Sequence, residues 1–375
     1  MKQLNKNTKF KHNIAIIPGD GIGPEVITAG LKVIKKALEL DNIQIKEKYY
    51  PWGSSYFKKY NKMMPEDGLD KLRQHDAIFF GAVGDRNIAD DITLWGLRLE
   101  ICQNFDQFAN VRPSKYMEGI NTPLNINLAR KIDWIIVREN SEGEYAGSGG
   151  IVHKGLPLEI GSELAIFTRE GCRRIHDYAF KLASRRPQKH LTLITKSNAQ
   201  RHGMKLWDKI FYEVSEKYPL VKTGKLLVDA ATAVMVNNPE KLDVVVATNL
   251  HADILSDLAS ALTGSLGIGA TANINTNKIY PSMFEPIHGS AFDIVGKGIA
   301  NPIGAVWSGV LMLNHLGEYK SANRIYNAIK LYAKNGGPFT PDLGGKAKTK
   351  GRGRGKGKKT KKHTVKSVVD LWLGA

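Results

Sequence analysis

The sequence predicts an α/β fold with a largely parallel central sheet. Short runs rich in Ile, Val and Phe recur along the chain, and segments with apolar residues at helical spacing lie between them. The first such run is followed by a glycine turn and a helix start. Strands that alternate with helices pair mainly in parallel, because each helix carries the chain back to the same edge of the sheet.

The first strand is expected at residues 13–17, and a glycine loop leads from it to a helix over residues 24–38. Pro24 and Glu25 suit the first turn of this helix, where backbone N–H groups lack partners and negative charge is favoured. Further strands are expected at residues 43–49, 76–83, 134–137, 191–195 and 243–248, and helices at 170–183 and 204–217. Residues 147–158 interrupt the alternation and predict a loop or a protruding β-arm.

The composition indicates the class of protein. A chain of 375 residues with 42% hydrophobic and 24% charged residues is typical of a globular protein with two domains. Two cysteines, Cys102 and Cys172, are too few for a disulfide framework and indicate a reducing compartment. The N-terminus lacks the apolar core of a secretory signal, and no apolar run is long enough to span a bilayer. We therefore expect a cytoplasmic protein that does not insert into a membrane.

The positive charge is concentrated near the C-terminus. Residues 346–366 hold 11 Lys or Arg and no acidic residue, which leaves the rest of the chain +7 of the net +18. This segment is predicted to be a disordered basic insertion, followed by a short closing helix at residues 367–375. Non-specific binding of RNA or another polyanion is a rival function for it. A solubilising linker is favoured, because the motifs that suggest catalysis lie elsewhere.

The glycine loop places Gly19, Gly21 and Gly23 just before a helix start. Such a turn can bind an anion, because unpaired N–H groups point out of the helix end. Its spacing departs from G-x-G-x-x-G at the third glycine, so it is not a Rossmann fingerprint. Taken alone, the loop is best interpreted as a tight structural turn.

Polar side chains follow three of the expected strands. Asp253 and Asp257 stand one helical turn apart and share a helix face. Carboxylate oxygens are ligands that suit Mg²⁺ or Mn²⁺, so a metal site is favoured here over a solvated charged face. Arg138 and Tyr145 follow another strand, and Lys196 a third. Arginine suits carboxylates, and Tyr or Lys can exchange protons. Taken singly, these three are better explained as an ion pair, a packed ring and a solvent-facing lysine.

Together the motifs resemble those of the metal-dependent β-decarboxylating dehydrogenases, the isocitrate/isopropylmalate dehydrogenase family. They occur in the family's order: IIPGDGIGPEV, NVRP, VRENSEGEYAG, TKSN, HADILSDLASALTGSLG and FEPIHGSAFDIVGKGIANP. The resemblance implies the family's own two-domain α/β fold with a largely parallel central sheet, not a Rossmann fold. It implies a cofactor-binding large domain at residues 1–107 and 264–345, and a substrate, metal and dimerisation domain at 108–263 with an arm near 146–166.

The resemblance also implies roles for single residues. Arg112 and Arg138 would hold substrate carboxylates, and Tyr145 would protonate the enol after CO₂ leaves. Lys196 would help to remove the hydroxyl proton. A Mg²⁺ or Mn²⁺ ion would be held by three carboxylates, Asp229, Asp253 and Asp257. Lys196 and Asp229 would act across the interface of a homodimer.

The implied cofactor is NAD. In the family an Asp at the position of Asp293 accepts the adenosine ribose hydroxyls, and its charge would repel the 2′-phosphate of NADP. Asn198 would lie near the nicotinamide. The other expected cofactor residues lie in one glycine-rich loop: His288, Gly289, Ser290, Ala291 and Asn301. Phe292 stands in this loop where the family usually has proline.

The chain departs from the family at one helix. Cys102 stands where most members have arginine, and Arg98 lies one turn earlier, where isopropylmalate enzymes have an apolar residue. An unpaired buried cation beside an isopropyl group would be costly. We therefore expect Arg98 to contact a small polar diacid. The segments TLWG, FDQFANVRP, YAGSGG and SMFEPIHGS resemble the tartrate and D-malate dehydrogenase branch of the family. This resemblance implies oxidation, with possible decarboxylation, of a small 2-hydroxy diacid such as D-malate or tartrate. Isopropylmalate and isocitrate are the alternatives, and the preferred diacid and metal stay open.

Overall fold

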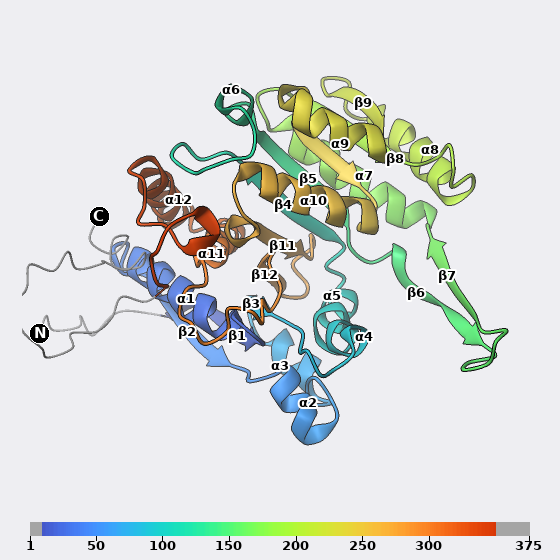
Figure 1. Cartoon of the computed structure of the whole chain (residues 1–375). Coiled ribbons are helices and arrows are strands. Elements are labelled where there is room, and N and C mark those ends of the chain that lie inside the picture. Colours follow the sequence, from blue (N-terminus) through green and yellow to red (C-terminus); the bar gives the residue numbers. More distant parts are fainter. Residues whose placement is uncertain (1–9, 350–375) are drawn as a thin grey trace, which may run out of the picture. The chain divides into compact units, whose positions relative to one another are not determined.

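The computed structural model describes residues 10–349, which form two compact units (Figure 1). Unit 1 contains the described residues 10–105, 117–123 and 263–349, and unit 2 contains 106–116 and 124–262. The expected domains stay a prediction, and they differ from the two units in assigning residues 117–123 to the second domain. The expected closing helix at 367–375 and most of the basic insertion lie outside the described residues.

Unit 1 is built on five strands in the order β2, β1, β3, β12, β11. Neighbouring strands pair in parallel except β11 and β12, which are antiparallel. Their bounds are β1 Phe10–Gly19, β2 Gln44–Tyr49, β3 Ala77–Ala82, β11 Ala270–Ile274 and β12 Ser282–Pro286.

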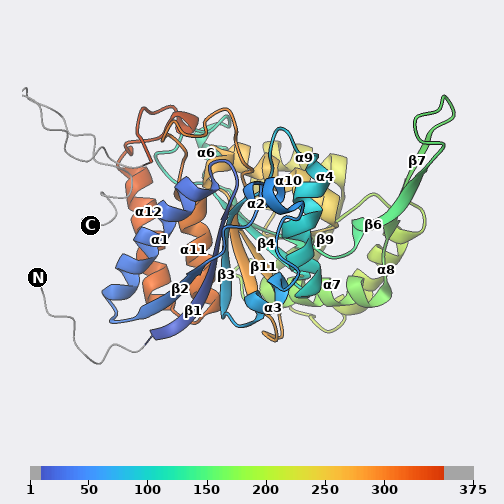
Figure 2. The ribbon, with the colours of Figure 1, turned by 90° about the horizontal axis from the view of Figure 1, so that it is seen from below.

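Helices cover both faces of these strands. Three long ones, α1 Gly23–Glu39, α11 Ile303–His315 and α12 Tyr319–Lys334, group on one face (Figure 2). The others are short: α2 Ser54–Tyr60, α3 Gly68–Arg73, α4 Asp90–Thr93, a π-helical turn Leu94–Leu99, α5 Glu100–Asn104, and 3-10 turns Leu266–Ile268 and Pro341–Leu343. On β3, Phe79 packs toward Gly30 of α1, while Ile78 and Phe80 join the apolar cluster with the short helices. Strand side chains alternate between faces, so both faces of β3 are apolar.

The glycine loop after β1 is a tight turn that packs against the expected cofactor loop. Gly21 has φ +57°, and a Cβ there would lie 2.0 Å from the Ser290 carbonyl oxygen. The Ile22 backbone N–H donates to the same oxygen over 3.0 Å. The Asp20 carboxylate accepts from Ser54 N (2.8 Å) and Gly84 N (3.0 Å). The loop therefore has the structural role that its spacing favoured.

Unit 2 is built on five strands in the order β4, β5, β10, β8, β9, with β4 antiparallel to β5 and the others parallel. The strand bounds are β4 Ala109–Lys115, β5 Asp133–Glu139, β8 His190–Thr195, β9 Lys222–Leu227 and β10 Val244–Ala247. The helices are α6 Ile126–Ala129, α7 Arg169–Ser184, α8 Gly203–Ser215, α9 Val228–Asn237 and α10 Asn249–Thr263, with a 3-10 turn Pro239–Lys241. The hairpin β6 Gly143–Val152 and β7 Ile160–Ile166 extends from this unit as an arm (Figure 2).

The predicted α/β fold with mainly parallel strands is confirmed. The six expected strands correspond to β1, β2, β3, β5, β8 and β10, and the three expected helices to α1, α7 and α8. Four strands were not expected: β4, β9, β11 and β12. Among residues 10–349, no helix combines the length and the apolar character needed to cross a membrane.

Candidate active site

Two buried arginines of unit 2 converge on one carboxylate. Arg112 lies on β4 and Arg138 lies on β5. The two residues are 5% and 2% exposed, respectively. Arg112 Nη1 donates to Asp253 Oδ1 over 3.0 Å, and Arg138 Nη1 donates to the same oxygen. Two guanidinium groups beside one carboxylate leave positive charge available to an anionic ligand. The structure thus brings together three residues that the sequence placed in the site.

Asp257 follows Asp253 by one turn of α10, as the i, i+4 spacing predicts. Desolvation raises the pKa of Asp257, and the repulsion of Asp253 adds to this, while the two arginines oppose it. Two oxygen-donor carboxylates that repel each other are stabilised by a cation between them. The donor chemistry therefore fits Mg²⁺ or Mn²⁺.

Three polar residues that the sequence did not single out orient the arginines. Asn249 Oδ1 accepts from Arg138 Nε (3.0 Å) and Nη2 (2.5 Å). Arg112 Nε donates to Asn110 Oδ1 over 2.9 Å, and Arg112 Nη1 donates to Ser256 Oγ over 2.6 Å. A signal for two of them was present, because Asn249 lies one turn before Asp253 and Asn110 lies two residues before Arg112 on the same strand face.

Tyr145 belongs to the same group. It lies on β6, is partly buried, and has the Arg138 guanidinium carbon 5.4 Å from its ring centroid. An arginine over an aromatic face is attracted by the ring's electron density and holds the ring in place. The phenol is thus placed beside the residue expected to hold the substrate.

Lys196 and Asp229 form a separate pair within unit 2. Lys196 leaves β8, Asp229 lies at the start of α9, and Lys196 Nζ donates to Asp229 Oδ1. The lysine holds the pKa of Asp229 below its usual value. Among residues 10–349, no three His, Cys, Asp and Glu side chains gather as a metal site. The expected union of Asp229 with the α10 carboxylates across a dimer stays a prediction.

The expected cofactor loop lies in unit 1, after β12. His288 Nδ1 lies 3.0 Å from the Gly289 carbonyl oxygen, and its Nε2 is buried with no hydrogen-bond partner among the described residues. An unsatisfied ring nitrogen in a glycine-rich loop fits a polar cofactor. Asp293 is exposed in the turn that follows Ala291. Ala291 itself is partly exposed and has a φ of +43°.

Two of the expected cofactor residues are held by other parts of unit 1. Ser290 Oγ donates to the Gly84 carbonyl oxygen over 3.1 Å. Asn301 Nδ2 donates to Asp342 Oδ2 over 2.9 Å, and Asn301 Oδ1 accepts from Ile303 N at the start of α11 over 3.0 Å. These bonds fix the loop at both ends. Asn198, also expected near the cofactor, is exposed in the turn after Lys196 in unit 2.

Arg98 lies in the π-helical turn of unit 1 and is 9% exposed. Its Nε donates to Glu285 Oε1 over 2.9 Å, and Nη2 lies 2.8 Å from the same oxygen. Cys102, which replaces the family arginine, is 1% exposed and belongs to the apolar cluster under the short helices. The expected contact of Arg98 with substrate stays a prediction.

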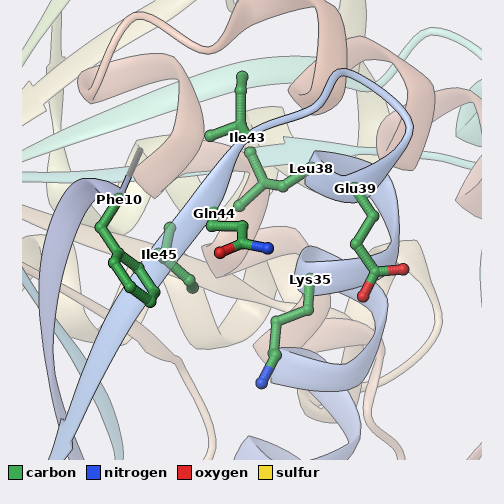
Figure 3. A pocket seen from close by; sticks show the side chains of 7 residues that line it. All are labelled: Phe10, Lys35, Leu38, Glu39, Ile43, Gln44 and Ile45. Atoms are coloured by element: carbon green, nitrogen blue, oxygen red, sulfur yellow. The ribbon is translucent and has the colours of Figure 1, made fainter. Parts of the chain in front are cut away.

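A pocket between α1 and the β2 edge of unit 1 contains none of the expected site residues (Figure 3). Its lining is Phe10, Lys35, Leu38, Glu39, Ile43, Gln44 and Ile45. Lys35 Nζ lies 2.8 Å from Glu47 Oε1, so its charge is already paired. A lysine, a glutamate and a glutamine among four apolar side chains provide neither a pair of carboxylates for a metal ion nor a pair of cations for a diacid.

Glu139, next to Arg138, titrates in an unusual range. It is 2% exposed and accepts hydrogen bonds from Ser141 N (2.9 Å), Ser141 Oγ (2.8 Å) and Glu142 N (2.5 Å). Desolvation outweighs these bonds and raises the pKa of Glu139 to about 7. The folded state therefore binds a proton that the unfolded state releases near the ordinary glutamate value.

We expect Glu139 to make the fold less stable as pH rises from 5 to 8. A carboxyl whose folded pKa is raised stabilises the fold at low pH, and that stability is lost as pH rises toward the folded pKa. Glu139→Gln should remove a loss of roughly 3 kcal/mol in the free energy of unfolding over this range. Urea unfolding of both proteins across the range measures it, with the exposed Glu163→Gln as control. A difference between wild type and variant that does not change with pH would contradict the expectation.

Comparison of the chain with known proteins gives matches to one family. A family model described as isocitrate/isopropylmalate dehydrogenase matches residues 13–362. A probable tartrate dehydrogenase/decarboxylase of Agrobacterium vitis is 59% identical over 341 residues, which cover 90% of this chain and 95% of that protein. The D-malate dehydrogenase [decarboxylating] of Escherichia coli (strain K12) is 44% identical over 343 residues, with 90% and 95% covered.

Solved structures agree with these relatives. The crystal structure of an isocitrate dehydrogenase from Methylococcus capsulatus is similar with a TM-score of 0.84 and 32% identity, covering 97% of this chain and 99% of that one. A β-decarboxylating dehydrogenase from Thermococcus kodakarensis is similar with a TM-score of 0.74 and 34% identity, covering 97% and 96%.

Proposed function

The chain belongs to the isocitrate/isopropylmalate dehydrogenase family, and we propose that it oxidises and decarboxylates a small 2-hydroxy diacid such as D-malate or tartrate, using NAD and a divalent metal ion. The observation that carries the proposal is the convergence of Arg112 and Arg138 on Asp253, one turn from Asp257. Guanidinium groups for two carboxylates and a carboxylate pair for a cation are the groups that a chelating diacid requires.

The arginines hold the substrate carboxylates in this proposal. Burial favours charge-assisted pairs, because water competes less for the guanidinium groups. Asn249 and Asn110 occupy the Nε sides of Arg138 and Arg112, so each guanidinium presents a fixed edge to the ligand. Fixed donors reduce the entropy lost when substrate binds and keep C2 in one orientation.

Residues already described would hold the metal ion and the nicotinamide cofactor. Asp253 and Asp257, with Asp229 of a second copy, would hold Mg²⁺ or Mn²⁺, and the loop with His288 and Asp293 would hold NAD. When bound, the metal ion supplies stabilisation for negative charge on the C2 oxygen, and NAD supplies the hydride acceptor. The carboxylate of Asp293 supports NAD over NADP, because it would repel a 2′-phosphate.

Tyr145 and, from the second copy, Lys196 move the protons. Lys196 accepts the proton of the C2 hydroxyl while the C2 hydrogen leaves with its electron pair as hydride. The bond from C3 to its carboxylate then breaks and releases CO₂, leaving the electron pair on the enolate. Tyr145 returns a proton to C3, and its place beside Arg138 supports this role.

A homodimer is part of the proposal. The arm of β6 and β7 exposes seven large apolar side chains in the isolated chain: Ile151, Val152, Leu156, Leu158, Ile160, Leu164 and Ile166. An apolar group of this kind on a hairpin favours burial against another surface. A second copy would cover the arm and bring Lys196 and Asp229 to the neighbouring site.

The test is a panel of D-malate, tartrate, isocitrate and 3-isopropylmalate with NAD⁺ or NADP⁺, with and without Mn²⁺. We expect the highest kcat/KM with D-malate or tartrate, NAD⁺ and Mn²⁺. The highest activity with isopropylmalate would contradict the substrate, and a preference for NADP⁺ would contradict the role of Asp293.

The same assay tests Arg98 as a substrate contact. Arg98→Leu should lower kcat/KM for the small diacid by roughly 10- to 100-fold, the usual effect of losing a charged hydrogen bond. Because Arg98 also pairs with Glu285, the matched control is Glu285→Gln, which breaks the ion pair and keeps the arginine. Equal losses in the two variants would assign Arg98 to the fold instead of the substrate.

A further inference from the structure

Asp208 on α8 connects two segments of unit 2 that carry proposed active-site residues. It is 8% exposed, and its Oδ2 accepts from Ser197 Oγ over 2.7 Å and from Lys225 Nζ over 2.5 Å. Its Oδ1 is buried and has no hydrogen-bond partner among residues 10–349. Ser197 follows Lys196 directly, and Lys225 lies on the strand that leads to Asp229.

The register of β8 and β9 explains why one carboxylate reaches both segments. The strands are parallel, with Leu193 opposite Lys225 and Thr195 opposite Leu227. Lys196 and Asp229 therefore leave the sheet at the same carboxyl edge, one and two residues beyond the last pair. Asp208 accepts hydrogen bonds from Ser197, just after Lys196, and from Lys225, on the strand just before Asp229.

From this geometry we propose that Asp208 is a positioning residue that holds Lys196 and Asp229 in place for the reaction, an inference that rests on the proposed function. Both side chains are partly or largely exposed, with 29% and 63% exposure in their ion pair. Neither is fixed by packing, so the backbone beneath must fix them before they reach a second copy. Residues of this kind do not contact the substrate or the metal ion, but they orient the side chains that do.

The chemistry of Asp208 fits this role better than a packing role. A buried carboxylate with one oxygen unsatisfied is costly, and a neutral side chain of the same size would fill the space without that cost. The charge has one evident use, because it holds the Lys225 ammonium and the Ser197 hydroxyl on a single oxygen. Unfavourable burial of a polar group is typical of residues that support a functional site.

The experiment separates the two connections. Asp208→Asn weakens both, Ser197→Ala removes the connection to Lys196, and Lys225→Met removes the connection to the strand before Asp229. The measurements are Mn²⁺ binding by the full-length protein without substrate, from the EPR signal of free Mn²⁺, and steady-state kcat and KM. For Asp208→Asn we expect a roughly 10-fold weaker Mn²⁺ affinity and a roughly 10-fold lower kcat, with little change in KM for the diacid.

The single connections should separate these effects. Ser197→Ala should lower kcat with unchanged Mn²⁺ affinity, and Lys225→Met should weaken Mn²⁺ binding. Asp177→Asn is the matched control, because Asp177 on the neighbouring α7 accepts from Tyr218 Oη over 2.8 Å and contacts neither segment. Its Mn²⁺ affinity and kcat should equal those of wild type.

Unchanged Mn²⁺ affinity and kcat in Asp208→Asn would overturn the inference, even if the variant were less stable, because Asp208 would then serve only the fold. If Asp208→Asn fails to fold, the other two variants decide, and wild-type behaviour in both would overturn it equally. A wild-type protein that neither binds Mn²⁺ nor turns over any diacid would instead contradict the proposed function.

Discussion

Replacing Asp257 by asparagine is expected to lower kcat/KM about a thousandfold while leaving the fold at least as stable. Stabilisation of oxygen charge by a bound metal ion is worth several kcal/mol, and about 4 kcal/mol corresponds to a thousandfold in rate. Desolvation and the repulsion of Asp253 raise the pKa of Asp257, so its ionised form is disfavoured in the folded chain. Removing that charge at neutral pH therefore relieves a small unfavourable interaction.

The stability measurement makes this prediction specific to the proposed site. Thermal unfolding without added metal should give an equal or higher Tm for Asp257→Asn, and Mn²⁺ should raise the Tm of wild type more than that of the variant. Asp70→Asn, at an exposed position of α3, is the control for loss of one negative charge. Unaltered turnover in Asp257→Asn would remove the carboxylate pair from the mechanism, and a large drop in Tm would make its role structural.

The parts of the fold that could be predicted from sequence are those whose pattern is strongly apolar. The β3 run AIFFGA is buried along its whole length, and β10 and β8 are nearly as apolar, so each is recognisable without tertiary information. The β9 run KTGKLL has no such signal, because it lies at one end of the strand order and contains two lysines and a glycine. It forms a strand because β8 supplies its hydrogen-bond partners.

The antiparallel strand β4 was not predicted for another reason. The β4 run ANVRPSK contains a proline and alternates polar with apolar residues, which suits a loop as well as a strand. Its pairing with β5 is decided by contacts across the fold. The same pairing brings Asn110 of β4 opposite Arg138 of β5.

The candidate site divides along the same line. Residues at strand ends or at helical spacing, such as Arg138 and Asp253, could be found because local geometry places them. The Arg98–Glu285 ion pair could not, since it joins residues 187 positions apart, and no local pattern states which cation meets which anion. Asp208 was missed because a single aspartate in an amphipathic helix has no distinctive spacing.

Replacing Tyr145 by phenylalanine is expected to lower the steady-state kcat by roughly a hundredfold to ten-thousandfold, the usual range for losing a general acid. The phenyl ring keeps the contact in which the Arg138 guanidinium carbon lies 5.4 Å from the ring centroid. Arg138, which is proposed to hold a substrate carboxylate, therefore stays in place. KM for the diacid should therefore change little. Only the hydroxyl is lost, and with it the proton for C3.

Rapid mixing distinguishes this step from hydride transfer. If Tyr145 acts only after CO₂ has left, Tyr145→Phe should still form about one NADH per site in a fast first turnover, followed by slow steady-state turnover. Tyr212→Phe, on an exposed face of α8, should behave as wild type. A missing burst in Tyr145→Phe would place the phenol at or before hydride transfer.

Lys196→Met completes the ordering of the steps. Lysine is proposed to take the hydroxyl proton as the hydride leaves, so its loss should abolish the burst that Tyr145→Phe retains. The two variants would then have similarly low kcat values for different reasons, and only the first turnover would distinguish them. If both lost the burst, the two residues would act together at C2, as one acid–base pair, and the separate protonation of C3 would need another donor.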